Sequence, residues 1–313
     1  MLDETTRVDT DIPISDLVLE YLDDCRIRNL SPTTLRWYDD RLTLLLADCW
    51  DAPISSLKMP HVKAVTARLL QSRAPATVNG YLRTLKSMLY YAVDNEYPVA
   101  FAPRRIKKIK EPKRIPPCFT VEQVEAMLAQ PDLTTFKGLR DFTMMSVLLD
   151  VGLRLSELTG LRLHDINIPH LKVRGKGDKE RIVATSDAMV KRLRKYLRTR
   201  ARVVRRFEVS TDLVFPSRYG SQMAGRTVDE MLKRYGAKAG VEGVRVSCHT
   251  WRFTYTSLAV RNGMSLTSLQ TCLGHATLTM TRHYAILNDT DAFDESREFS
   301  PLAALGKKGG RRR

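Results

Sequence analysis

A basic, proline-rich stretch divides the chain and constrains its fold more than any other feature. Residues 104–117, RRIKKIKEPKRIPP, hold seven basic residues, one acid and three prolines. Proline lacks a backbone N–H and disfavours helix in the residue before it, so this stretch does not suit a packed helix. We expect an extended linker between two domains, each with its own core in a chain of 313 residues. Its charges either stay solvated or lie along the phosphates of a nucleic acid, and the extended conformation favours contact with the phosphates.

Helix-start signals recur before the linker. Ser15 precedes a segment of helical periodicity, and Ser31 is followed by Pro32, a favoured residue in the first helical turn. Two further helices are expected, over about 60–71 and from Pro75 onward, where apolar residues recur at helical spacing. This part of the chain is therefore predicted to be a four-helix domain.

Beyond the linker, helices enclose a few short strands. Thr120 and Gln123 have the spacing of a capping box, and residues 137–150 form an apolar segment that ends near Gly152. Residues 171–174 and 181–185 are predicted to be two strands joined by a glycine-containing loop. LVF at 213–215 is a candidate third strand. The expected fold is mainly α, with a small antiparallel β-sheet in the second domain.

One predicted helix, over about 187–206, is unusually basic. From Lys191 onward it carries nine Lys or Arg residues and no acid. We expect a solvated outer face that attracts a nucleic-acid backbone without contacting bases.

The overall charge indicates a polyanionic partner. Fifty-one Lys and Arg against 35 Asp and Glu give a formal net charge of +16. Nucleic acid is the first candidate and an anionic membrane surface the second. No run approaches 18 apolar residues and the N-terminus is acidic, so we expect a soluble cytoplasmic protein. The five cysteines form no CxxC pair and the histidines lack zinc spacing, which predicts free thiols and no metal.

Four separated segments carry residues suited to phosphate chemistry. They are GLRLSELTGL at 152–161, RGKGDKER at 174–181, HTWR at 249–252 and LGHATLTMTRHY at 273–284. A phosphodiester attacked by an oxygen nucleophile gains negative charge, which the guanidinium groups of Arg154 and Arg252 can clamp through paired N–H donors. A tyrosine nucleophile needs a base and a positive field, because its reference pKa is near 10. His249 and the two arginines can supply them.

In this order, the segments resemble the tyrosine recombinase family, also called phage-type integrases or Xer-like recombinases. That family has an Arg, a Lys in a β-hairpin, a His-x-x-Arg box, then Leu-Gly-His with a Tyr nine residues later. The resemblance implies that Lys176 protonates the 5′ leaving oxygen, that His275 hydrogen-bonds the scissile phosphate, and that Tyr284 is the nucleophile. His283 is the second candidate for the histidine that hydrogen-bonds the scissile phosphate. SPTTLRWY and PATVNGYLRTLKSMLYYAV are similar to the family's core-binding domain.

The resemblance also implies the domain roles. Residues 1–103 would be the core-binding domain, 104–117 the linker, 118–305 the catalytic domain and 306–313 a flexible basic tail. It implies a 3′-phosphotyrosine intermediate, with no cofactor, and four protomers on two duplex DNA core sites. Residues 285–305 would pack on a neighbouring protomer, and accessory DNA-bending proteins could assist.

The expected function is site-specific recombination that integrates or excises a mobile element, by an enzyme associated with the nucleoid. Three alternatives stay open. The first is Xer-like resolution of replicon dimers, the second a topoisomerase-like enzyme that nicks and reseals DNA, and the third a non-catalytic architectural DNA-binding protein. The third requires lost catalytic residues, and none of the expected positions is lost.

Overall fold

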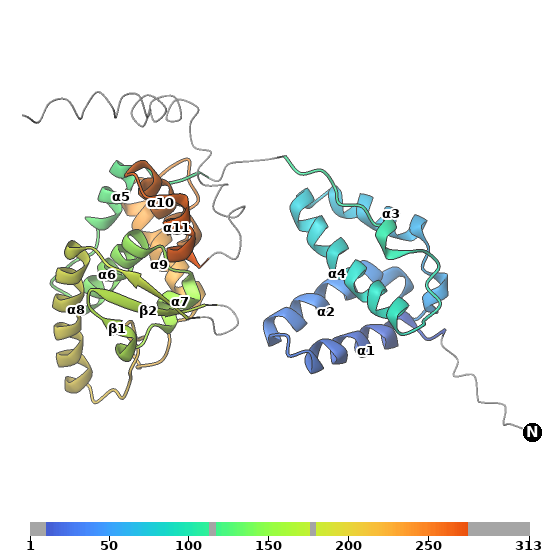
Figure 1. The fold of residues 1–313 in the computed structure, drawn as a ribbon, viewed down its shortest axis with the longest axis horizontal. Coiled ribbons are helices and arrows are strands. Elements are labelled where there is room, and N and C mark those ends of the chain that lie inside the picture. The colour runs from blue at the N-terminus through green and yellow to red at the C-terminus, as the bar shows by residue number, and fades with distance from the viewer. Residues whose placement is uncertain (1–10, 113–116, 176–179, 275–313) are drawn as a thin grey trace, which may run out of the picture. The chain divides into compact units, whose positions relative to one another are not determined.

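The chain separates into two compact units, residues 1–113 and 114–313 (Figure 1). The computed structural model describes residues 11–112, 117–175 and 180–274. The fold is mainly helical with one small sheet, which confirms the predicted class. Among the described helices, none is long and apolar enough to cross a bilayer. All five cysteines are in described segments, and none forms a disulfide.

Over its described residues, 11–112, unit 1 is a four-helix domain, as predicted. Its helices are α1 (Ile14–Ile27), α2 (Pro32–Leu46), α3 (Met59–Leu70) and α4 (Pro75–Asp94), with short 3-10 turns η1 (Ala47–Cys49), η2 (Ile54–Ser56) and η3 (Pro103–Arg105). The Ser31 side chain caps α2 by accepting from the Thr34 N–H at 3.2 Å. The first helix differs from expectation. It starts one residue before Ser15, with Pro13 in the capping position and no side-chain cap.

The first part of the basic linker stretch is held on unit 1. Ile106 is buried in the unit 1 core and Ile109 packs against it. The buried Asn79 side chain pairs with the Ile109 backbone in both directions, donating to its carbonyl at 2.9 Å and accepting from its N–H at 2.8 Å. The described linker residues 106–112 form no helix or strand, and two apolar side chains among the charges reach the core of unit 1.

Helix α6 (Phe136–Val151) is central to unit 2. It packs against α8 (Asp187–Arg206), α10 (Cys248–Arg261), α5 (Val121–Leu128) and α7 (Leu155–Gly160). Buried residues occur on all its faces, and the buried Asp141 carboxylate accepts hydrogen bonds from Arg140 at 2.9 Å and the Tyr235 hydroxyl at 3.1 Å. The described part of the unit also contains α9 (Gly225–Lys238), α11 (Leu266–Leu273) and the 3-10 turn η4 (Leu163–Asp165).

The sheet of unit 2 is antiparallel, in the order β1 (Ile166–Asn167), β2 (His170–Arg174), β3 (Glu180–Ala184). The two predicted strands are therefore confirmed. The prediction of a third strand at 213–215 is wrong. Leu213 forms only an isolated bridge with Arg162. The carbonyl groups of this segment accept hydrogen bonds from side chains of α8 instead of from a neighbouring strand. Arg200 Nε donates to the Leu213 carbonyl at 2.9 Å, and the Tyr196 hydroxyl donates to the Val214 carbonyl at 2.8 Å.

Candidate active site

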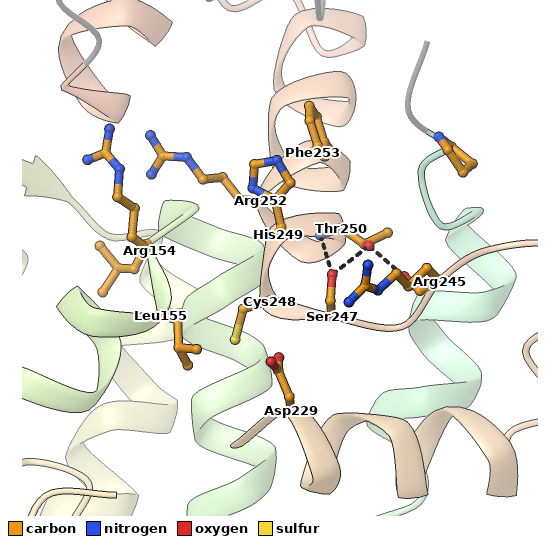
Figure 2. A pocket seen from close by; sticks show the side chains of 12 residues that line it. Arg154, Leu155, Asp229, Arg245, Ser247, Cys248, His249, Thr250, Arg252 and Phe253 are labelled. Carbon is orange, nitrogen blue, oxygen red and sulfur yellow. Dashed lines mark hydrogen bonds between the residues drawn. The ribbon is translucent and has the colours of Figure 1, made fainter. Parts of the chain in front are cut away.

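A pocket of about 460 Å³ in unit 2 collects three of the six predicted site residues (Figure 2). Arg154 comes from the start of α7, and His249 and Arg252 come from the first turns of α10. Leu155, Asp229, Arg245, Ser247 and Phe253 are also among the lining residues. Both predicted arginines thus line one pocket, although 98 residues of sequence separate them.

Gly152 places these two arginines relative to each other. It ends α6 in the left-handed conformation, with φ +64°. A Cβ atom there would lie 2.3 Å from the Tyr255 ring, so both the backbone conformation and the space require glycine. The Gly152 carbonyl accepts a hydrogen bond from Arg252 Nη1 at 2.6 Å, and Arg154 follows two residues later. The same turn of backbone therefore accepts a hydrogen bond from Arg252 and contains Arg154.

The second arginine is also tied to the end of α11. Arg252 is 4% exposed, and its Nη2 donates to the Leu273 carbonyl at 2.7 Å. The buried guanidinium is thus oriented by main-chain acceptors from two separate segments. In Figure 2 the guanidinium groups of Arg154 and Arg252 point to the same side of the pocket.

Arg154 is oriented by a buried carboxylate. Glu157, 5% exposed, accepts from the Arg154 side chain at 2.8 Å and from the Arg154 backbone N–H at 2.8 Å. Arg154 stands in the capping position of α7, and its side chain remains 38% exposed. One nitrogen of the Arg154 guanidinium group is therefore held by Glu157, while the side chain stays partly exposed.

Arg181, on β3, joins three segments of the site. Its guanidinium donates to both Glu157 oxygens, at 2.8 and 2.9 Å, and its Nε donates to the Cys272 carbonyl in α11 at 2.7 Å. The bidentate pair fixes the Glu157 carboxylate in one orientation. Gly274 ends α11 at φ +62°, and a Cβ atom there would lie 3.1 Å from the Arg181 side chain. The network thus connects the sheet, α7 and the end of α11.

The network keeps Glu157 ionised. Burial raises the pKa of its carboxyl, but hydrogen bonds from Arg181 and Arg154 and the charge of Arg181 outweigh burial and lower that pKa to about 2. Since the folded-state pKa lies below the usual value, the carboxylate stabilises the fold above about pH 4.5, and this contribution is lost as the pH falls toward 2.

Glu157→Gln is expected to destabilise unit 2 by about 3 kcal/mol at pH 7, since it leaves Arg181 buried without a counter-charge. The deficit should shrink as the pH falls below about 4.5, because the Glu157 carboxyl then begins to protonate in the unfolded chain while it stays ionised in the folded protein down to about pH 2. Urea unfolding between pH 7 and pH 3 measures this. Glu230→Gln, which removes the exposed partner of Arg226, is the matched control and should leave stability nearly unchanged. A deficit that does not vary with pH would contradict the assignment.

His249 has the properties of a proton acceptor. Its ring stands edge-on to Phe253, with centroids 4.3 Å apart and an interplanar angle of 74°. Partial desolvation in the pocket, and then the charge of Arg252, lower the pKa of His249 below its usual value. This shift favours the neutral imidazole, the form that can take a proton.

The other three predicted residues lie outside the described residues. They are Lys176, His275 and Tyr284, and the same holds for His283, residues 285–305 and the tail 306–313. The described chain resumes at Glu180, where β3 begins, and its last residue is Gly274, the cap of α11. Within the described ranges, no group of three or more His, Cys, Asp or Glu residues could hold a metal ion.

Glu157 and Arg181 were not predicted from the sequence. Glu157 carried a usable signal, since an acid three residues after a helix-capping position is the pattern of a capping box. Arg181 carried none, because it meets Glu157 across 24 residues and only once β3 packs beside α7.

Comparison with known proteins identifies the family. The model of the phage integrase family matches residues 117–291. Tyrosine recombinase XerC of Chlamydia pneumoniae is 30% identical over 237 residues, which cover 75% of each chain. Tyrosine recombinase XerD of Staphylococcus aureus is 29% identical over 236 residues, covering 74% of this chain and 79% of the relative. The chain therefore belongs to the phage integrase family of tyrosine recombinases, as predicted, and is an enzyme of the class that cleaves and rejoins DNA.

Solved structures share the fold. A XerH site-specific recombinase bound to a palindromic difH substrate has a TM-score of 0.72 at 17% identity, covering 93% of this chain and 91% of that one. A lambda integrase tetramer bound to a Holliday junction has a TM-score of 0.70 at 16% identity, covering 88% and 80%. The Tn1549 transposon integrase in complex with circular intermediate DNA has a TM-score of 0.66 at 21% identity, covering 91% and 99%.

Proposed function

We propose that this tyrosine recombinase acts on duplex DNA at core recombination sites, through a 3′-phosphotyrosine intermediate, to integrate or excise a mobile element. The observation that carries the proposal is the convergence of Arg154 and Arg252 on one pocket that His249 also lines. Two fixed guanidinium groups suit a phosphoryl group whose negative charge grows during reaction. The fold shared with lambda integrase and the Tn1549 transposon integrase supports a role with mobile elements.

The proposed cleavage step conserves the phosphodiester bond energy. The Tyr284 oxygen attacks the scissile phosphorus and gives its proton to His249. The bond from phosphorus to the 5′ oxygen breaks, Lys176 protonates that oxygen, and His275 donates a hydrogen bond to the phosphate. Arg154 and Arg252 stabilise the added charge. A 5′-hydroxyl of a partner strand then gives its proton to Lys176 and attacks the phosphorus. The bond from phosphorus to the Tyr284 oxygen breaks, that oxygen regains its proton from His249, and the DNA is rejoined with no cofactor.

The remaining assignments complete the proposal. Residues 1–103 form the core-binding domain, 104–117 the linker and 118–305 the catalytic domain. Four protomers assemble on two sites, with residues 285–305 exchanged between neighbours. The enzyme works in the cytoplasm on the nucleoid, with accessory DNA-bending proteins as candidate helpers. DNA-bound structural neighbours, one of them a tetramer, support the DNA partner and the assembly.

Resolution of replicon dimers is the second candidate role. The similarity to XerC and XerD over three quarters of the chain favours it. Both roles use the same cleavage chemistry, so they differ only in the DNA sites that are joined.

Covalent trapping tests the function. Nicked duplexes drawn from the DNA that flanks the gene should trap the protein on DNA, because the short strand released beside the nick diffuses away and cannot religate. We expect an adduct that survives denaturing gels, forms in the presence of a metal chelator, and leaves a free 5′-hydroxyl. An adduct joined to a 5′ end, or strictly dependent on added metal, would overturn the proposal.

A further inference from the structure

Helix α8 (Asp187–Arg206) carries seven exposed cations that the proposed site does not use. Two of its nine basic residues are structural: Arg200 is 3% exposed and donates to carbonyl groups, and Arg192 donates to the Ser146 hydroxyl at 2.9 Å. The other seven are Lys191, Arg194, Lys195, Arg198, Arg202, Arg205 and Arg206, here called the α8 stripe. In the described parts of the chain, no carboxylate lies within salt-bridge distance of any of them.

The stripe occupies one face of the helix. Its members are separated by steps of three or four residues, or lie next to one another, which places them within about a third of the helix circumference. The opposite face holds Met189, Leu193 and Tyr196, which are buried in the core of unit 2. At 1.5 Å per residue the stripe is about 22 Å long, a length of duplex that carries about 13 phosphates.

Uniform charge on this face opposes the stability of the helix. Lys191 and Lys195, Arg194 and Arg198, and Arg198 and Arg202 are like-charged pairs four residues apart, a spacing at which like charges repel. A mixture of acids and bases would keep the face soluble and would stabilise the helix through opposite-charge pairs. Solvation alone therefore does not explain why the stripe is entirely basic.

The stripe is separate from the catalytic pocket. None of the residues that line the pocket lies on α8. Helix α6 packs against both α8 and α10, and it lies between them in Figure 1. DNA held in the pocket therefore leaves the stripe free for other phosphates.

We propose that the α8 stripe is a second, sequence-independent DNA-binding surface, which holds the phosphate backbone of duplex DNA outside the catalytic pocket. Duplex DNA is the occupant because the chain belongs to a family that acts on it, so the choice of partner rests on the proposed function. Cations at the stripe gain affinity by releasing the counterions of the phosphates, and require no base contact.

The test measures how binding depends on salt, using random-sequence duplex DNA and the full-length protein. The neutralised variant carries Lys191→Gln, Arg194→Gln, Arg198→Gln and Arg202→Gln. The matched control exchanges Lys and Arg at the same four positions and keeps every charge. The slope of log K against log salt is negative, and each lost phosphate contact reduces its magnitude by about 0.9, so the slope of the neutralised variant should be less steep by about 3 to 4. The charge-keeping control should match wild type.

Two results would overturn the proposal. An unchanged slope in the neutralised variant would mean that the stripe is solvated or serves a different partner, such as an acidic protein. An equal loss in the charge-keeping control would mean that packing, not charge, was altered. The melting temperature of the neutralised variant should not fall, since like-charged neighbours are removed. Covalent trapping separates this proposal from the enzymatic one, because the stripe variant should still form the adduct at saturating protein.

Discussion

Tyr284→Phe is expected to abolish the covalent adduct on nicked DNA while DNA binding persists. Phenylalanine keeps the ring and removes only the oxygen that would bond to phosphorus, so no intermediate can form. Tyr284 stands apart from the other ten tyrosines because it alone follows Leu-Gly-His at the spacing of the family. Denaturing gels measure the adduct and band shifts measure binding.

A tyrosine elsewhere in unit 2 provides the matched control. Tyr219 is exposed, at 73%, and Tyr219→Phe should form the adduct at the wild-type rate. An adduct that persists in Tyr284→Phe would show that another residue is the nucleophile.

Arg154→Ala and Arg252→Ala are each expected to slow cleavage by about 10² to 10³-fold, the typical cost of one lost donor to a developing charge. Binding should weaken far less, because each variant loses only one of many positive charges. Single-turnover cleavage and band shifts at matched salt separate the two effects. Arg226→Ala, which removes a surface arginine paired with Glu230, should change neither strongly.

The two alanine variants should differ in the stability of unit 2. Arg154 is partly exposed, so its removal leaves the fold nearly intact. Removing Arg252 leaves the carbonyl groups of Gly152 and Leu273 without this donor, and unit 2 should melt at a lower temperature. Equal losses of binding and cleavage in Arg154→Ala would contradict a role in stabilising the transition state.

Local signals in the sequence predicted local structure well. Ser31, and the Thr120 and Gln123 pair, each predicted a helix start that the structure confirms, since a capping side chain acts within three residues. The segment 213–215 failed because its apolar run is buried by contact with α8, and a periodic pattern does not distinguish that from strand pairing.

Residues of the site could be predicted only where they belong to a recognisable sequence motif. Arg154, His249 and Arg252 stand in recognisable segments, and the structure brings them to one pocket. Arg181 could not be found in this way, because its contacts with Glu157 and Cys272 exist only after three segments have packed. Whether Lys176, His275 and Tyr284 join this pocket remains a prediction for the trapping experiments.

The use of main-chain acceptors around Arg252 affects how far the surrounding sequence can diverge during evolution. The carbonyl groups of Gly152 and Leu273 belong to the backbone, so any chain that follows the same path supplies them whatever its side chains. Glycine is demanded at 152, by the conformation and by Tyr255, and the left-handed conformation of Gly274 favours it there as well. Drift at most surrounding positions therefore leaves the alignment of the arginine unaffected. An anchor of this kind can persist in descendants whose sequences have diverged almost completely.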